Sequence, residues 1–217
     1  MIGSRAPRPR RKRADRYHHG DLRRALVQEA VRRIQRHGVE GLTLRAVGQA
    51  LGVSRTALYR HFADKSALLA AVAREGFRTL RLELVDAWEQ GGRGQEAFDA
   101  MSVVYVRFAV THPSHYRVMF GGFVDARAAA PGLREEGGAA FQVLVDALVA
   151  QQQNGLVRGD EPSQLARFIW AIVHGVAMLA IDGQLQRQDA DAEDLIRYAA
   201  DRIRSGIGIP GDNRVLW

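Results

Sequence analysis

Apolar residues recur at helical spacing along most of the chain. Leu22, Leu26, Ala30 and Ile34 follow one another at intervals of four, and residues 69–88 carry a longer stripe of the same kind. Positions three and four apart lie on one face of an α-helix. Alternation of apolar and polar residues, which would indicate a half-buried strand, is nearly absent. The pattern therefore predicts an all-α protein.

Capping and turn residues divide these stripes into separate helices. Gly38 suits the left-handed position after a helix, while Thr43 and Ser54 can cap the helices that follow them. The glycine-rich stretch at 90–94 and the His112-Pro113 pair mark two further boundaries. Residues 121–133 are predicted as a long loop. The expected helices cover residues 21–37, 44–51, 55–62, 64–89, 95–111, 113–120, 134–154, 162–182 and 191–206.

The distribution of charge separates the N-terminal third from the rest. Residues 1–62 contain 15 Lys and Arg against 4 Asp and Glu, whereas residues 63–217 contain 16 against 20. Such asymmetry predicts a polyanionic partner for the basic part, although a basic tail that only aids solubility is the alternative.

We expect a disordered basic arm (1–16), a DNA-binding domain (17–66), a helical ligand-binding and dimerisation domain (67–207) and a C-terminal tail (208–217).

Composition narrows the class of protein further. The absence of cysteine excludes disulfides and thiolate metal sites and fits a reducing compartment. No apolar stretch follows the basic N-terminus, and the run 168–181 is short for a membrane span, so we expect a cytoplasmic protein without a membrane partner. His112 and His115 have a possible ligand spacing, but no carboxylate or cysteine completes a metal site. We therefore expect neither a metal nor a cofactor.

The stretch SRTALYRHF, at 54–62, has the character of a recognition helix. It follows a short predicted helix and a turn at Gly52, which is the order of elements in a helix-turn-helix motif. Leu58 and Phe62 lie four apart and would face inward. The other face would present Arg55, Thr56, Tyr59 and Arg60. Arginine can bond guanine, threonine can contact a thymine methyl group and tyrosine can bond a phosphate, although a merely solvated charged face is the alternative.

Residues 37–69, HGVEGLTLRAVGQALGVSRTALYRHFADKSALL, resemble the DNA-binding region of the TetR family of transcriptional regulators. The resemblance is carried by Thr43, the stretches 51–54 and 58–62, Lys65 and Leu68. Gly48 departs from the alanine that is usual there, which weakens the short helix by about 1 kcal/mol relative to alanine. The resemblance implies an N-terminal three-helix DNA-binding domain followed by a helical-bundle regulatory domain.

The resemblance also implies roles for individual residues in binding double-stranded DNA. The DNA-binding set is Tyr17, His18, Thr43, Arg45, Ser54, Arg55, Thr56, Ala57, Tyr59, Arg60, His61 and Lys65. Arg55, Thr56 and Ala57 would contact base edges. Residues 59–61 and Lys65 would hold phosphates, as would Tyr17 and His18 ahead of the first helix. The arginine-rich arm would enter the minor groove or bind DNA without sequence preference.

The C-terminal part contains the most apolar helix, FIWAIVHGVAMLAI at 168–181. It is apolar around its circumference, which predicts burial on all sides, and the family resemblance implies a homodimer formed by the last two long helices. Trp170, His174 and Gly175 resemble the signature of the WHG-type regulatory domain. The candidate lining of an effector pocket is Tyr105, Phe108, Tyr116, Met119, Phe120, Phe141, Trp170 and His174, with ordinary core packing as the alternative.

These observations favour a dimeric repressor that a small-molecule effector releases from a palindromic operator. An activator, or a DNA-binding regulator without an effector, is the alternative. A helical enzyme using His174 for proton transfer is a third hypothesis. The sequence offers no nucleophile–base pair, phosphate-binding loop or carboxylate dyad, so we predict that the protein is not an enzyme.

Overall fold

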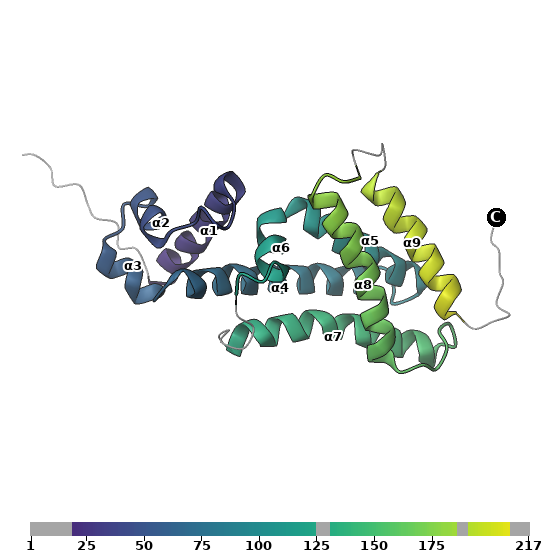
Figure 1. Cartoon of the computed structure of the whole chain (residues 1–217). Helices are drawn as coiled ribbons and strands as arrows, with labels where there is room; N and C mark the ends of the chain where they lie inside the picture. The colour runs from purple at the N-terminus through teal and green to yellow at the C-terminus, as the bar shows by residue number, and fades with distance from the viewer. Residues whose placement is uncertain (1–18, 125–130, 186–190, 209–217) are drawn as a thin grey trace, which may run out of the picture.

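The structure is a computed structural model that describes residues 19–124, 131–185 and 191–208. The described residues form nine α-helices, as the spacing of apolar residues predicts. The first three make a small N-terminal unit at one end of the molecule (Figure 1). Their bounds are α1 His19–His37, α2 Leu44–Ala50 and α3 Arg55–His61.

Helix α4, Lys65–Gln90, joins the N-terminal unit to the C-terminal bundle. Asp64 caps its start by accepting a hydrogen bond of 2.7 Å from the Ala67 N–H. Its 26 residues correspond to a rod about 39 Å long. Figure 1 shows it running as one element from beneath α1–α3 into the bundle.

The remaining helices pack around the C-terminal half of α4. Helices α5, α6 and α7 lie against it, while α8 packs on α5 and α7, and α9 packs on α5 and α8. Their bounds are α5 Gln95–Thr111, α6 Pro113–Phe120, α7 Pro131–Gln153, α8 Pro162–Ile181 and α9 Ala192–Ile207. Helix α7 begins three residues earlier than the sequence predicts, because Pro131 suits the first turn of a helix.

Two apolar clusters form the core. The N-terminal cluster joins α1, α2 and α3 to the start of α4, and it also takes in Val118 of α6 and Leu133 of α7. The larger C-terminal cluster lies between α4, α5, α7, α8 and α9. Helix α6 therefore contributes to both clusters, since its Tyr116 is buried in the second.

Helix α8 is less enclosed than its sequence predicts. Phe168 is 51% exposed and Leu179 is 44% exposed, while Ile169 and Val173 on the opposite side are buried. Among the described residues, α8 is the helix long and apolar enough to cross a membrane by length and composition alone, a test that core helices of soluble proteins also pass. Only one side of α8 faces the bundle, and the expected burial of the other side against a second copy stays a prediction.

Candidate functional site

Local hydrogen bonds fix the geometry of α2 and α3. The Thr43 side chain accepts from the Ala46 N–H, and the Ser54 side chain accepts from the Ala57 N–H, both at 3.2 Å. Gly52 turns the chain between the two helices at a φ of +63°, where a side chain would be strained. These two caps and one turn give the two short helices defined ends.

The outer face of α2 and α3 is polar and accessible. Leu58 and Phe62 are 2% and 1% exposed, so α3 is anchored by its inner face. Arg55, Thr56 and Arg60 are exposed on the other face, and Tyr59 is 46% exposed. A groove between the two helices is lined by Arg45, Gly48, Gln49, Val53, Arg55, Leu58 and Tyr59. This surface offers two guanidinium groups, an amide and a phenol in one concave area.

Other members of the predicted DNA-binding set lie at the edge of this surface. Ala57 and His61 are half-buried, and the Lys65 ammonium donates a hydrogen bond of 3.2 Å to the Glu40 carbonyl oxygen. Lys65 therefore also ties α4 to the loop before α2. Tyr17 and His18 lie outside the described residues.

Gln49 is a candidate that the sequence analysis missed. It is exposed on α2, one turn after Arg45, and lines the same groove. The spacing of four residues was a usable signal, because it puts both side chains on the same face of the helix. Glutamine can pair with adenine in the major groove.

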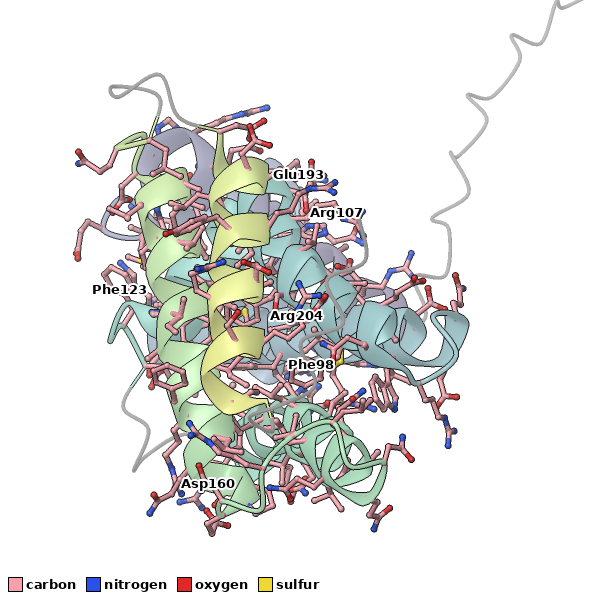
Figure 2. All side chains as sticks on the ribbon, turned by 90° about the vertical axis from the view of Figure 1, so that its right-hand side faces the viewer. Phe98, Arg107, Phe123, Asp160, Glu193 and Arg204 are labelled. Atoms are coloured by element: carbon pink, nitrogen blue, oxygen red, sulfur yellow. The ribbon has the colours of Figure 1, made fainter. Side chains whose placement is uncertain are left out.

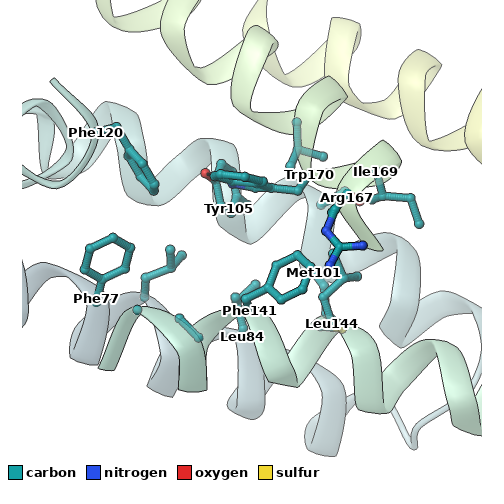
Figure 3. A pocket seen from close by; sticks show the side chains of 15 residues that line it. Phe77, Leu84, Met101, Tyr105, Phe120, Phe141, Leu144, Arg167, Ile169 and Trp170 are labelled. Atoms are coloured by element: carbon teal, nitrogen blue, oxygen red, sulfur yellow. Dashed lines mark hydrogen bonds between the residues drawn. The ribbon is translucent and has the colours of Figure 1, made fainter. Parts of the chain in front are cut away.

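A cavity of about 360 Å³ lies in the C-terminal bundle between α4, α5, α6, α7 and α8. Each of these helices contributes an aromatic ring to the lining, and Figure 3 labels them as Phe77, Tyr105, Phe120, Phe141 and Trp170. Its lining consists of Phe77, Leu80, Leu84, Met101, Ser102, Tyr105, Phe120, Gly137, Ala140, Phe141, Leu144, Arg167, Ile169, Trp170 and Val173. Such a predominantly apolar lining with a few polar groups is typical of small-molecule sites.

A hydrogen-bonded network forms part of the cavity wall. The Trp170 Nε1–H donates to the Tyr105 hydroxyl at 2.9 Å, and the Tyr116 hydroxyl donates to the same oxygen at 3.1 Å. The Tyr116 oxygen and His174 Nδ1 are 2.6 Å apart. Burial raises the pKa of Tyr105 to about 12 and lowers the pKa of His174, so these groups are uncharged near neutral pH.

The eight predicted pocket residues fall into two groups. Tyr105, Phe120, Phe141 and Trp170 line the cavity. The other four do not line it: Phe108, Tyr116, Met119 and His174 pack behind or beside it, and Tyr116 and His174 reach it through the network.

The cation among the lining residues, Arg167, was not predicted from the sequence. Arg167 lies three residues before Trp170, so the two share a face of α8, and its guanidinium projects beside Phe141 in Figure 3. The polar group Ser102 was also missed. Its position one turn before Tyr105 on α5 was the available signal.

The fold and the α2–α3 surface define a helix-turn-helix DNA-binding regulator with a separate helical regulatory domain. Comparison with known protein families supports the same class of protein. Residues 26–72 match the family described as bacterial regulatory proteins of the tetR family, and residues 98–203 match the family described as the tetracyclin repressor-like C-terminal domain. The chain belongs to the TetR family of transcriptional regulators. The prediction that it is a regulator and not an enzyme is therefore confirmed.

Similar proteins span most of the chain. An HTH-type transcriptional repressor of Mycobacterium tuberculosis is 29% identical over 185 residues, which are 82% of this chain and 87% of the repressor. A solved protein of unknown function from Rhodococcus is 33% identical, covers 90% of this chain and 100% of its own, and has a TM-score of 0.80. A structure described as a SmeT–triclosan complex shares the fold at 24% identity, with a TM-score of 0.59 and coverage of 87% and 92%.

Proposed function

We propose that this protein is a dimeric, cytoplasmic repressor that binds a palindromic operator and leaves it when a small-molecule effector fills the C-terminal cavity. The observation that carries the DNA-binding part is the outer face of α2 and α3. There Arg45, Gln49, Arg55, Tyr59 and Arg60 are exposed beside one another, while Leu58 and Phe62 hold α3 in place from within. These side chains suit base edges and phosphates in a major groove.

The proposed dimer uses the outer faces of α8 and α9, which lie side by side and face the viewer in Figure 2. Phe168, Leu179 and Tyr198 are 51%, 44% and 63% exposed on these helices. Between Phe168 and Leu179, Gly175 has no atom near its missing side chain, so a second copy could approach closely. A symmetric dimer would set the two α3 helices in successive major grooves, about 34–36 Å apart.

Release by an effector is supported by the position of α6. Phe120 of this helix lines the cavity, and Val118 lies in the N-terminal apolar cluster beside α1. A ligand that displaces Phe120 would therefore move a helix that supports the DNA-binding unit. The ligand must prefer the conformation that does not bind DNA, because equal affinity for both conformations shifts nothing.

The cavity favours an effector-responsive regulator over one without an effector, since its space is not filled by side chains. The description of the M. tuberculosis relative as a repressor favours repression over activation. One structural neighbour is described as a complex with the small molecule triclosan. Activation remains the second candidate, and a reporter gene behind the operator, with and without the protein, distinguishes the two.

Selection of binding sites from random duplex DNA tests the DNA-binding proposal. We expect enrichment of a palindrome, and Arg55→Ala and Arg60→Ala should each weaken binding by about 1–3 kcal/mol at fixed salt. Arg107→Ala, which removes an exposed arginine from α5, is the matched control and should leave affinity unchanged. Unchanged affinity in both α3 variants, or binding without sequence preference and with a steep salt dependence, would contradict the proposal.

A further inference from the structure

The network around Tyr105 contains one more hydrogen than it can use. Trp170, Tyr105, Tyr116 and neutral His174 bring one polar hydrogen each. Trp170 and Tyr116 both donate to the Tyr105 oxygen, so the single hydroxyl hydrogen of Tyr116 is already used. The 2.6 Å contact between Tyr116 and His174 then has Nδ1–H of His174 as its donor. His174 Nδ1 also lies 3.3 Å from the Tyr105 oxygen, but a protonated Nδ1 cannot accept. In this arrangement the hydroxyl hydrogen of Tyr105 therefore has no acceptor within the network.

The alternative histidine tautomer moves the surplus hydrogen elsewhere. If Nδ1 of His174 accepts from Tyr116, then Tyr105 donates to the Tyr116 oxygen, and the hydrogen left over is on His174 Nε2. An oxygen acceptor inside the cavity would favour the first tautomer, because Tyr105 is a lining residue and His174 is not. The Tyr105 hydroxyl therefore offers a donor to an occupant of the cavity, and its oxygen, which already accepts two hydrogen bonds, offers no free acceptor in that state. The Ser102 hydroxyl is another neutral polar group of the lining.

The charge of the lining residues also favours an occupant that accepts hydrogen bonds. Arg167 is the one lining residue with a full charge at neutral pH, and no Asp, Glu or Lys is among the described lining residues. It is exposed, which places it at the edge of the cavity. A cationic occupant would lose its hydration beside this guanidinium with no carboxylate to replace it. An anionic end group would have a partner there.

The size and the walls of the cavity limit the rest of the occupant. A volume of about 360 Å³ corresponds to about twelve water molecules at ~30 Å³ each. It thus suits a molecule with on the order of a dozen non-hydrogen atoms. Phe77, Leu84, Phe120 and Phe141 present rings and methyl groups to that volume, so the body of the molecule must be apolar.

We propose that the effector is an apolar, uncharged or anionic molecule whose oxygen accepts the Tyr105 hydroxyl hydrogen, with Arg167 favouring an anionic end and excluding cations. This inference rests on the proposed function, since it assigns the chemistry of the same cavity. It makes Tyr105 and Arg167 the residues that select the ligand. The remaining lining residues, apart from Ser102, supply the apolar contact.

Matched ten-carbon probes test this assignment by calorimetry with the full-length protein and without DNA, below the concentrations at which the probes form micelles. Decanoate is an anionic acceptor, 2-decanone a neutral acceptor and decylamine a cation with only donors at pH 7. We expect decanoate and 2-decanone to bind, and decylamine to bind at least tenfold more weakly than decanoate. Failure of both acceptors to bind, or equal binding of decylamine, would overturn the proposal.

Three variants separate the two selecting groups. Tyr105→Phe should weaken 2-decanone about three- to tenfold, the effect of one lost hydrogen bond. Tyr116→Phe disturbs the same network but leaves the lining intact, so its effect should be clearly smaller. Arg167→Gln should weaken decanoate about two- to fivefold at low salt and leave 2-decanone unchanged. A Tyr105→Phe protein with wild-type affinity for 2-decanone would refute the role of the hydroxyl.

The result is independent of operator selection. A selected palindrome without probe binding would overturn the ligand assignment and leave the DNA-binding function standing. Probe binding with the expected variant pattern, but without any selected operator, would support the ligand assignment and contradict the DNA-binding function.

Discussion

The N-terminal unit and the C-terminal bundle differ in what their interiors contain. Around α3 the interior is filled by side chains such as Leu58 and Phe62, and the polar groups lie outside. The interior of the bundle differs, because it contains a cavity and a network of Tyr105, Tyr116 and His174. The difference shows that one short stretch of sequence can specify a polar outer face, whereas the lining of a cavity depends on residues brought together from distant helices.

The largest expected loss of stability comes from removing a buried ring from the N-terminal cluster. Phe62→Ala removes a ring that is 1% exposed and lies 4.8 Å beneath the Arg23 guanidinium. We expect a loss of about 3–5 kcal/mol in the free energy of unfolding of this unit, because the ring is replaced by a void. Urea unfolding followed by circular dichroism measures the loss.

Thr56→Ala is the control for that experiment. Thr56 is exposed on the same helix, so its removal should change stability by less than about 0.5 kcal/mol. Equal losses in the two variants would show that α3 is not anchored by its inner face. Probe binding to the C-terminal cavity should survive in Phe62→Ala if the two clusters unfold separately.

A smaller loss of stability is expected at the contact between α4 and α6, where the N-terminal unit meets the bundle. Gly76 of α4 lies against α6, and a methyl group added there would come within 2.5 Å of the Met119 sulfur and 3.1 Å of the His115 Cβ atom. Gly76→Ala should therefore push α6 away from α4 and cost about 1–3 kcal/mol, despite the better helix propensity of alanine. Thermal unfolding checks the stability, and operator affinity reports the displacement of α6.

Shortening the opposing side chain is the matched rescue. Met119→Ala alone leaves a gap, but combined with Gly76→Ala it removes the clash, so the double variant should be more stable than the sum of the single effects predicts. Additive losses in the two variants would mean that the close approach of α4 and α6 carries no strain.

The fold was largely predictable because its causes are local. The caps Thr43 and Ser54 and the turn at Gly52 are readable from residue type, and the helix bounds differ from the prediction by only a few residues. The exposed face of α3 follows from the same spacing. The roles assigned to those exposed residues in DNA binding stay predictions.

The cavity was less predictable because spacing does not distinguish a residue that fills space from one that borders it. Phe108 and Phe120 both lie on apolar stripes, yet Phe108 is 1% exposed in the packed core and Phe120 lines the cavity. The distinction depends on how α5, α6 and α8 cross. Arg167 lies directly before the apolar run 168–181, and the sequence alone did not indicate that its charged side chain lines the cavity.

The internal network gives the bundle a pH dependence through His174. Burial lowers the pKa of His174 in the folded protein, so the unfolded chain binds a proton first as the pH falls. The contribution of His174 to stability is therefore present above pH ~6.5, the ordinary histidine value, and is lost as the pH falls through the folded pKa. We expect the free energy of unfolding to fall between pH 7 and pH 5.

The contribution of His174 can be distinguished from that of other histidines by comparing how steeply the free energy of unfolding changes with pH in different variants. His174→Gln should give a shallower dependence of unfolding free energy on pH than the wild type over that interval. His37→Gln, which replaces an exposed histidine of α1, is the comparison variant. Equal slopes in wild type and His174→Gln would show that the burial of His174 does not govern the response.

The smallest expected effect tests how tightly the short helices of the N-terminal unit are packed. Gly48→Ala improves helix propensity by about 1 kcal/mol, but the new methyl group would lie 3.1 Å from the Leu58 Cδ2 atom. Because Leu58 must shift by a few tenths of an ångström, we expect the two effects to offset each other within about 0.5 kcal/mol. Ala50→Gly measures the propensity effect at an exposed position of the same helix. A gain in Gly48→Ala as large as the loss in Ala50→Gly would mean that Leu58 yields freely, and that the N-terminal core is less tightly packed than its closed interior indicates.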